Sequence, residues 1–558
     1  MDEIEEDEPR DNHYNSKITR LNCNPTDIFG RHYLCPTTRP ANLDRCLGNC
    51  ELASTVMIFG CLAVLVVVLY FWWKKTTRDA SLPPGPTTVP FLGNLLSVNP
   101  ETMLDKFQKY RKKYGDVFSL VTGSKTIVVV SGYDTLREIF IKHGDVSSAR
   151  PDIFITREVG KFKGIANASG ALWKEHRTFT LNALREFGFG KRSFESKIIE
   201  ELEAFVQEIH SKKGQSFNVH NLLNVCISNI MCSINFGKRY DHGDLDFCRL
   251  LDSVNQNLTN ENVMLVATVL PFVRYIPGDP CRIKNLLANI EIAESHFRQL
   301  VKEHEQTFDE NDLRDFIDVF LKRMKSEQNN PNTTFDEDQL VKIIHELFVA
   351  GTETTATALR WFCLFMIRYP KVQEKMRKEV YDVIGTSRFP RLEDKPSLPY
   401  CEAVIHETLR VGAIGPFSIP HGLSRDLHYN GFIIPKDALL IQNLYSSFFD
   451  EKIFPDPNAF KPERFLDEKG SLQNTEKVLV FSLGRRMCPG EVLARMELFL
   501  FVTLIIQRFK LEPADINNVP PEKGVMGVTH APLDFLMKAI EIISTPPPQS
   551  EDSFTVFV

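Results

Sequence analysis

The sequence predicts a mainly α-helical protein with a small β-sheet region and a helical membrane anchor near its N-terminus. Apolar residues recur at helical spacing over long segments such as 202–209 and 347–367, whereas β-branched runs are short. One long uncharged segment precedes both patterns. With 558 residues, 43% of them hydrophobic and 25% charged, the chain has a globular composition and is long enough to bury a large core. Its net charge of -6 argues against nucleic acid as a partner.

The uncharged segment covers residues 52–73. At 1.5 Å per residue this helix is about 33 Å long, which matches the hydrocarbon core of a bilayer. Lys74, Lys75 and Arg78 follow at once and predict that the C-terminal side faces the cytosol. About fifty residues precede the segment and residues 2–8 are mostly acidic, so neither a cleavable signal nor a mitochondrial presequence is expected. We therefore expect a single-pass protein of the endoplasmic reticulum membrane.

Four further parts flank or follow this anchor. Residues 1–51 form an N-terminal extension, expected in the lumen, where its four cysteines (Cys23, Cys35, Cys46 and Cys50) allow two disulfides in any of three pairings. A flexible, dispensable tail is the alternative for this extension. Residues 74–86 form a basic, proline-rich hinge, because proline fixes φ and removes a backbone donor. Residues 87–545 form the main domain, and residues 546–558 form a tail expected to be flexible.

Within the main domain, β-branched runs at 117–121, 126–130 and 439–441 predict a small sheet. The longest helical pattern covers 334–369, or roughly 50 Å at the helical rise, so this helix must cross the domain.

A small and polar island, residues 350–355, interrupts the apolar pattern of this long helix. Ala350 and Gly351 leave room beside the backbone, and Thr354 can draw a carbonyl or a water into the helix ladder. Glu353 and Thr354 then offer an acid and a hydroxyl that can pass protons into the resulting groove. Taken alone, the same run also fits a local helix kink.

Two other helical patterns bring polar side chains onto one face. Glu407 and Arg410 are three residues apart and can pair, although an ordinary surface ion pair is the simpler interpretation. Trp173 and Arg177 are four residues apart and can donate N–H groups to one anionic group.

Cys488 lies in a glycine-punctuated loop just before a helical stretch at 492–501. Gly484 and Gly490 permit backbone conformations and close approaches that a side chain would prevent. The loop and the following helix N-terminus supply N–H donors and positive potential, which favour a thiolate. Arg486 can meet a carboxylate at the edge of a ligand. The loop therefore predicts an iron ligand, with a buried structural cysteine as the alternative.

The pattern Phe481-x-x-Gly484-x-Arg486-x-Cys488-x-Gly490 resembles the haem-binding signature of the cytochrome P450 family. The resemblance implies the cytochrome P450 fold, haem b (iron protoporphyrin IX) as cofactor, and Cys488 as axial ligand of its iron. Thiolate ligation favours O–O cleavage over reversible oxygen binding, so the implied chemistry is monooxygenation. Segments 164–165, 184–188 and 494–498 are similar to the microsomal members, of family-two type, that oxidise drugs, steroids and fatty acids.

The same resemblance implies roles for the other patterns. The island with Ala350, Gly351, Glu353 and Thr354 resembles the oxygen-activation motif. Glu407 and Arg410 resemble two members of a buried charged triad, completed by Arg464, that fixes the cysteine loop. A final set of residues is expected to hold the haem carboxylates or lie beside the haem: Trp173, Arg177, Arg486, Arg150, His421, Phe481, Gly484 and Gly490. His421 also fits an ordinary hydrogen-bonded histidine.

The expected function is insertion of one atom of dioxygen into a lipophilic steroid, fatty acid or xenobiotic. The resemblance implies that segments 153–165, 344–354, 413–419 and 525–528 contact this substrate, and these segments are mostly apolar. Because no nucleotide-binding glycine loop is found, electrons are expected from a separate reductase. The resemblance implies that this reductase is the membrane-bound NADPH cytochrome P450 reductase. Its candidate basic contacts are Lys174, Lys191, Arg192 and Arg485.

Two other functions stay open. One is a haem-binding sensor or carrier without turnover. The other is a non-oxidative haem isomerase or dehydratase of the same fold, against which the presence of Glu353 and Thr354 counts.

Overall fold

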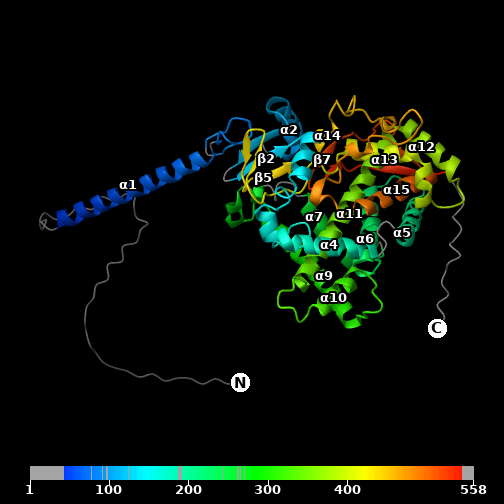
Figure 1. Cartoon of the computed structure of the whole chain (residues 1–558), viewed down its shortest axis with the longest axis horizontal. Helices are drawn as coiled ribbons and strands as arrows, with labels where there is room; N and C mark the ends of the chain where they lie inside the picture. Colours follow the sequence, from blue (N-terminus) through cyan, green and yellow to red (C-terminus); the bar gives the residue numbers. More distant parts are fainter. Residues whose placement is uncertain are drawn as a thin grey trace, which may run out of the picture. The chain divides into compact units, whose positions relative to one another are not determined.

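The computed structural model of the chain (Figure 1) describes residues 43–542, except residues 77, 91, 96–98, 123–124, 187–191, 242, 260–262, 264–265 and 269. The chain divides into two compact units, residues 1–68 and 69–558. The side chains of the four N-terminal cysteines and the tail at 546–558 lie outside the described residues, so the expectations about them stay predictions.

The predicted membrane segment is helical and lies within α1 (Leu43–Thr76). Its large apolar side chains are exposed between Val56 and Phe71. A search of the described residues finds no helix with the length and apolarity needed to cross a membrane.

The second unit is mainly helical, as predicted. Its helices after α1 are α2 (Pro100–Tyr114), α3 (Tyr133–Arg137), α4 (Gly170–Glu186), α5 (Arg192–Ser211), α6 (Val219–Phe236), α7 (Leu245–Thr259), α9 (Ile283–Thr307), α10 (Phe316–Ser326), α11 (Glu337–Arg368), α12 (Pro370–Val383), α13 (Pro399–Gly412), α14 (Tyr445–Phe448) and α15 (Glu491–Arg508). Short π-helical turns cover Glu138–Lys142 and Ile155–Val159, and 3-10 turns cover Pro271–Tyr275, Leu392–Ser397, Pro462–Phe465, Thr475–Lys477 and Gly484–Arg486.

The three predicted strands are confirmed and belong to one sheet. This sheet has the order β1 (Val117–Thr122), β2 (Lys125–Val130), β5 (Leu439–Gln442). Strand β2 is antiparallel to β1 and parallel to β5, with Val128 opposite Leu440. The described residues also form three two-stranded sheets: β3 (Leu427–Tyr429) with β4 (Phe432–Ile434), β6 (Phe509–Pro513) with β9 (Met537–Glu541), and β7 (Gly524–Met526) with β8 (His530–Pro532).

Helix α11 confirms the predicted long helix and forms the centre of the core. Its N-cap is Asp336, whose side chain accepts a hydrogen bond of 2.6 Å from the Gln339 N–H, and it ends at Arg368 before Pro370. Most of its side chains are buried, and it contacts α6, α9, α13 and α15 (Figure 1). Beyond its first turn, where Asp338 is exposed, α11 offers few solvent-accessible side chains.

The second half of the predicted hinge is docked on the sheet. Ser119 of β1 donates its N–H to the Pro84 carbonyl at 2.8 Å and its hydroxyl to the Pro83 carbonyl at 2.6 Å. A Cβ on Gly85 would lie 2.0 Å from the Ser119 oxygen, so glycine is required for this approach. These contacts fix the direction in which the chain enters the domain.

Candidate active site

A mostly apolar cavity of about 450 Å³ lies between α11, α15 and the loops around them. All four segments predicted to contact substrate contribute to its lining, among them Val159, Leu347, Phe417 and Val528. Cys488 lies in the same lining. The cavity therefore brings the predicted iron ligand and the predicted substrate segments together.

The polar island of α11 opens onto this cavity. Ala350 and Thr354 are exposed although most of the helix is buried, and both line the cavity. The Thr354 hydroxyl donates a 2.7 Å hydrogen bond to the Ala350 carbonyl, one turn earlier. The Met231 side chain of α6 lies directly beside the backbone at Gly351. An added Cβ at this position would lie 2.4 Å from the Met231 sulfur. Gly351 thus permits a close helix contact, which the sequence alone did not reveal.

The Glu353 carboxyl is buried, and its hydrogen-bond partners are residues other than Thr354. Its Oε1 accepts hydrogen bonds from the Thr357 hydroxyl at 3.0 Å and from the Thr529 hydroxyl at 3.3 Å. Burial raises the pKa of Glu353 above its usual range, and the Thr357 hydrogen bond and the charge of Arg360 only partly oppose this rise. A carboxyl with a raised pKa retains its proton more readily near neutral pH.

The loop before α15 is held by backbone contacts. The Cys488 N–H donates to the Phe481 carbonyl at 2.9 Å, and a 3-10 turn covers Gly484–Arg486. Gly484 has φ +76, and an added Cβ would lie 2.2 Å from the Phe140 carbonyl oxygen. Both the conformation and the close approach require glycine here.

The Cys488 thiol lies at the N-terminus of α15, whose N-cap is Gly490. Burial raises the pKa of this thiol, whereas the backbone N–H groups of Gly490 and Glu491 and the charge of Arg177 lower it. The groups that lower the pKa are the donors and the cation that a thiolate needs.

Three guanidinium groups gather near one side of the cavity. Burial, with the neighbouring charges of Arg150 and Arg177, lowers the pKa of Arg486 to about 8. Burial likewise lowers the pKa of Arg150 to about 10. The hydrogen bonds described for these three arginines go to backbone carbonyls and none goes to a carboxylate: Ser148, Ile165 and Ala168 for Arg486, Ala166, Ile419 and Pro420 for Arg150, and Met487 for Arg177. Such a cluster suits a ligand that brings its own carboxylates.

Trp173 adds an unused donor to this cluster. Its ring lies under the Arg486 guanidinium, 3.9 Å from ring centre to guanidinium carbon. Its Nε1 is buried and has no hydrogen-bond partner among the described residues. A buried unpaired N–H is costly, so a ligand acceptor at this position would be favourable.

His421 has partners at both ring nitrogens. Nδ1 donates to the Ser147 carbonyl at 2.7 Å, and Nε2 lies 3.4 Å from Nε2 of Gln442. Burial and the nearby Arg150 keep the pKa of His421 well below its usual range. The arrangement matches the alternative prediction of an ordinary hydrogen-bonded histidine.

The expected triad is assembled on α13 and the 3-10 turn Pro462–Phe465. Arg410 binds Glu407 through two hydrogen bonds of 2.7 and 2.8 Å, and Arg464 donates to Glu407 at 3.0 Å. All three side chains are buried, which excludes the ordinary surface pair. The remaining donors of both arginines bind carbonyls of Phe448, Pro455, Asp456, Pro457 and Ala459. The triad thus fixes the segment 448–459.

Of three polar α11 residues in the cavity lining, His345 and Glu346 lie within the predicted contact segment 344–354, whereas Lys342 lies outside it and was missed. His345 and Glu346 follow Lys342 by three and four residues, and Thr354 follows Glu346 by eight. The signal was a charged or polar residue at each turn of a helix that must cross the core. Glu497 of α15 was also missed; burial raises its pKa to about 8, opposed by a 3.1 Å hydrogen bond from Thr355.

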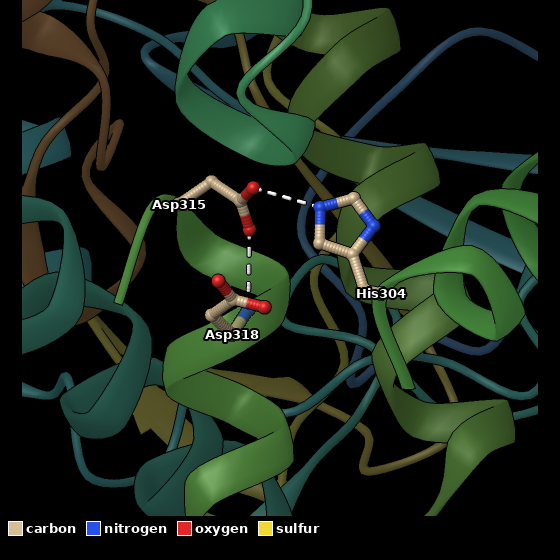
Figure 2. Close-up of side chains that lie close together, drawn as sticks. All are labelled: His304, Asp315 and Asp318. Carbon is tan, nitrogen blue, oxygen red and sulfur yellow. Dashed lines mark hydrogen bonds and ion pairs between the residues drawn. The ribbon is translucent and has the colours of Figure 1, made fainter. Parts of the chain in front are cut away.

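A separate cluster has the composition of a metal site but is saturated by the chain itself. It comprises His304, Asp315 and Asp318 (Figure 2). His304 Nε2 lies 2.8 Å from Asp315 Oδ2, and the other Asp315 oxygen accepts the Asp318 N–H at 3.1 Å. Arg314 occupies both oxygens of Asp318 at 2.6 and 2.8 Å. The cluster therefore ties α9 to the start of α10.

Comparison with known proteins agrees with this geometry. The family model described as Cytochrome P450 matches residues 83–539. Cytochrome P450 2B4 of Oryctolagus cuniculus is 39% identical over 482 residues, which cover 85% of this chain and 97% of that protein. Cytochrome P450 2C8 of Homo sapiens is 36% identical over 477 residues, with the same coverage. Cytochrome P450 2G1 of Rattus norvegicus is 38% identical over 485 residues, covering 84% and 97%.

The matched segment contains the whole cavity lining, from Val159 to Thr529, and excludes only the anchor region and the C-terminal end. Since the family match and nearly complete relatives cover the same residues, the chain belongs to the cytochrome P450 family and is a P450 monooxygenase.

Proposed function

We propose that this chain inserts one atom of dioxygen into a lipophilic organic substrate, at a haem whose iron Cys488 would ligate. The reaction would take place on the cytosolic side of the endoplasmic reticulum membrane. The observation that carries the proposal is that the Cys488 thiol, the Thr354 hydroxyl and a mostly apolar wall belong to one cavity. An apolar wall supplies affinity for greasy molecules.

The residues fit haem b as cofactor. Cys488 would ligate its iron, while Arg150, Arg177, Arg486 and the N–H of Trp173 would hold its carboxylates; these are the unbalanced cations and the unpaired donor described above. A haem with a thiolate ligand supplies the centre at which dioxygen is bound and its O–O bond is cleaved.

Burial raises the pKa of the Cys488 thiol, and several groups of the chain oppose this rise. The N–H groups of Gly490 and Glu491 donate to the sulfur, and the N-terminus of α15 adds positive potential. The charged triad of Glu407, Arg410 and Arg464 keeps the segment 448–459, which precedes the Cys488 loop in the sequence, in position.

We also propose that Glu353 and Thr354 deliver protons to the cavity. Burial raises the pKa of Glu353, which favours its protonated form, and Thr354 presents a hydroxyl on the cavity surface. A proton leaving Glu353 would reach the cavity through water and Thr354, after which Glu353 is reprotonated from solvent. Ala350 keeps the wall beside Thr354 free of a larger side chain.

The anchor and the electron donor complete the proposal. Residues 52–73 are uncharged and exposed where described, which suits burial in lipid. Electrons would come from NADPH through NADPH cytochrome P450 reductase, with the exposed Lys174 and Arg485 as basic contacts. Lys191 and the side chain of Arg192 lie outside the described residues.

The test is a difference spectrum of the reduced full-length protein with carbon monoxide, followed by turnover with reductase, NADPH and a panel of lipophiles. We expect the thiolate-type Soret shift and NADPH-dependent oxygenated product. Cys488→Ser should abolish the shift, whereas Cys281→Ser, at another half-buried cysteine outside the cavity, should retain it. A wild-type protein that binds haem without this shift would refute the ligand assignment, and a shift without product would favour a sensor.

A further inference from the structure

One end of the cavity is polar although most of its wall is apolar. Five residues form this polar end: Lys342, His345 and Glu346 of α11, with Asn167 and Asn257 from other segments. All three α11 residues line the same cavity as Thr354.

The polar end is well separated from the proposed reacting end. His345 and Thr354 are nine residues apart on α11, which is about 13 to 14 Å along the helix axis. Val349 and Ala350 line the wall between them. A molecule that touches both ends therefore needs an apolar body of about this length.

The charges at the polar end are already matched. Lys342 donates to Glu294 and, at 2.6 Å, to the Val159 carbonyl. Burial alone would raise the pKa of Glu294, but the bonds from His345 and Lys342 lower it to about 2, so this carboxyl is ionised. The Lys342 ammonium is therefore already bound and is not free for a substrate carboxylate.

Glu346 is also occupied. Its Oε2 accepts the N–H groups of Ile165 at 2.6 Å and Ala166 at 2.8 Å, and its Oε1 accepts from Asn167 at 2.8 Å. Burial raises the pKa of Glu346, opposed by these three donors. A substrate carboxylate placed here would approach this second acid rather than a free cation.

His345 is the group with spare hydrogen-bonding capacity. Its Nδ1 lies 3.5 Å from the Glu294 carboxylate, which favours the tautomer with the proton on Nδ1. Nε2 is then an acceptor, and in the described part of the chain no hydrogen bond to it is found. The side chain keeps 14% of its surface exposed, and it lines the cavity.

We infer that the substrate carries an uncharged hydroxyl group that donates to His345 Nε2, with an apolar body that extends to Thr354. The oxidised carbon then lies at the end far from the hydroxyl. This inference rests on the oxidation site proposed above.

The test compares three probes with the same chain: dodecanol, its methyl ether, and dodecanoate. The extended dodecyl chain has about the required length. Binding to the haem-loaded full chain is measured by calorimetry, without turnover. We expect dodecanol to bind roughly five- to tenfold more tightly than the ether, which cannot donate, and also more tightly than dodecanoate.

His345→Leu should reduce the preference for the alcohol over the ether to within about twofold, because the acceptor is lost. His345→Gln keeps an acceptor and should retain part of the preference. His296→Leu is the matched control, since His296 is a half-buried histidine of α9 outside the cavity lining, and it should retain the full preference.

Equal affinities of alcohol and ether, tighter binding of dodecanoate, or a preference that persists in His345→Leu would each overturn the inference. The carbon monoxide spectrum, recorded on every preparation, tests the proposed function separately. A normal spectrum with no alcohol preference rejects the substrate class alone, whereas an absent thiolate shift rejects the oxidation site.

Discussion

The Arg486 guanidinium stacks on the Trp173 ring at 3.9 Å, while the Nε1 of that ring is buried and lacks a hydrogen-bond partner among the described residues. The stacking fixes the ring plane and thereby the direction of its N–H. Arg486 itself is held by three backbone carbonyls. The pair is thus a rigid set of donors awaiting an anionic group.

Replacing Trp173 with Phe should weaken haem retention. The ring stack is retained, but the N–H to a haem carboxylate is lost, and a hydrogen bond to a charged group contributes roughly 1.5 to 3 kcal/mol. We expect the rate of haem loss to rise by about tenfold or more, measured as transfer to an excess of apomyoglobin. Trp361→Phe is the control, because the Trp361 N–H already donates to the His530 carbonyl at 2.9 Å. Equal rates in the two variants would contradict the role of Trp173.

Replacing Thr354 with Ala should uncouple NADPH consumption from product. The hydroxyl on the cavity surface is removed, whereas Cys488 and its donors are unchanged, so the carbon monoxide spectrum should stay intact. We expect product per NADPH to fall by about tenfold, which is modest for the loss of a proton-transfer group. Thr354→Ser keeps the hydroxyl and should retain most of the coupling. Unchanged coupling in Thr354→Ala would remove this residue from the relay.

The sequence predicted the parts of the site whose chemistry is local. The loop around Cys488 was recognisable because its glycines, Arg486 and the following helix are contiguous. The same holds for the polar island of α11 and for the strands of the three-stranded sheet. Each of these patterns lies within one short segment, where spacing alone determines which side chains share a face.

The contacts that the sequence did not reveal join distant segments. His345 lies in the predicted contact segment 344–354, but nothing in that segment indicates its contact with Glu294 of α9. Gly351 lines the cavity, and its lack of a side chain also admits Met231 of α6, which the local sequence does not indicate. In both cases the partner is far away in the sequence, and the side chain's role follows only from helix packing.

Replacing Glu407 with Gln should strongly destabilise the protein. Arg410 and Arg464 would then be buried without a counter-charge, and breaking a buried ion pair costs about 3 to 5 kcal/mol. The free energy of unfolding is measured by chemical denaturation, and haem incorporation should fail in parallel. Lys375→Ala breaks the exposed pair with Glu463 and should cost less than about 1 kcal/mol. A small effect of Glu407→Gln would show that the triad is not needed for stability.

The pair of His304 and Asp315 should make stability depend on pH (Figure 2). Burial alone would lower the pKa of His304, but the hydrogen bond and charge of Asp315 outweigh burial and raise it, with Asp318 adding to the effect. The unfolded value is about 6.5. Because the folded pKa is the higher one, the stabilisation is complete below the unfolded pKa and is lost as pH rises through the folded pKa.

His304→Gln removes the titrating group and should therefore flatten this part of the pH profile. We expect the stability difference between wild type and variant to be largest below pH about 6.5 and to shrink as the pH rises above that value. Denaturation midpoints measured over this range provide the check. His210→Gln changes an exposed histidine that pairs with Glu541, and it should leave the profile close to that of the wild type. A wild-type profile parallel to that of His304→Gln would mean that His304 stays in one protonation state throughout, and the charged pair would then contribute no pH dependence.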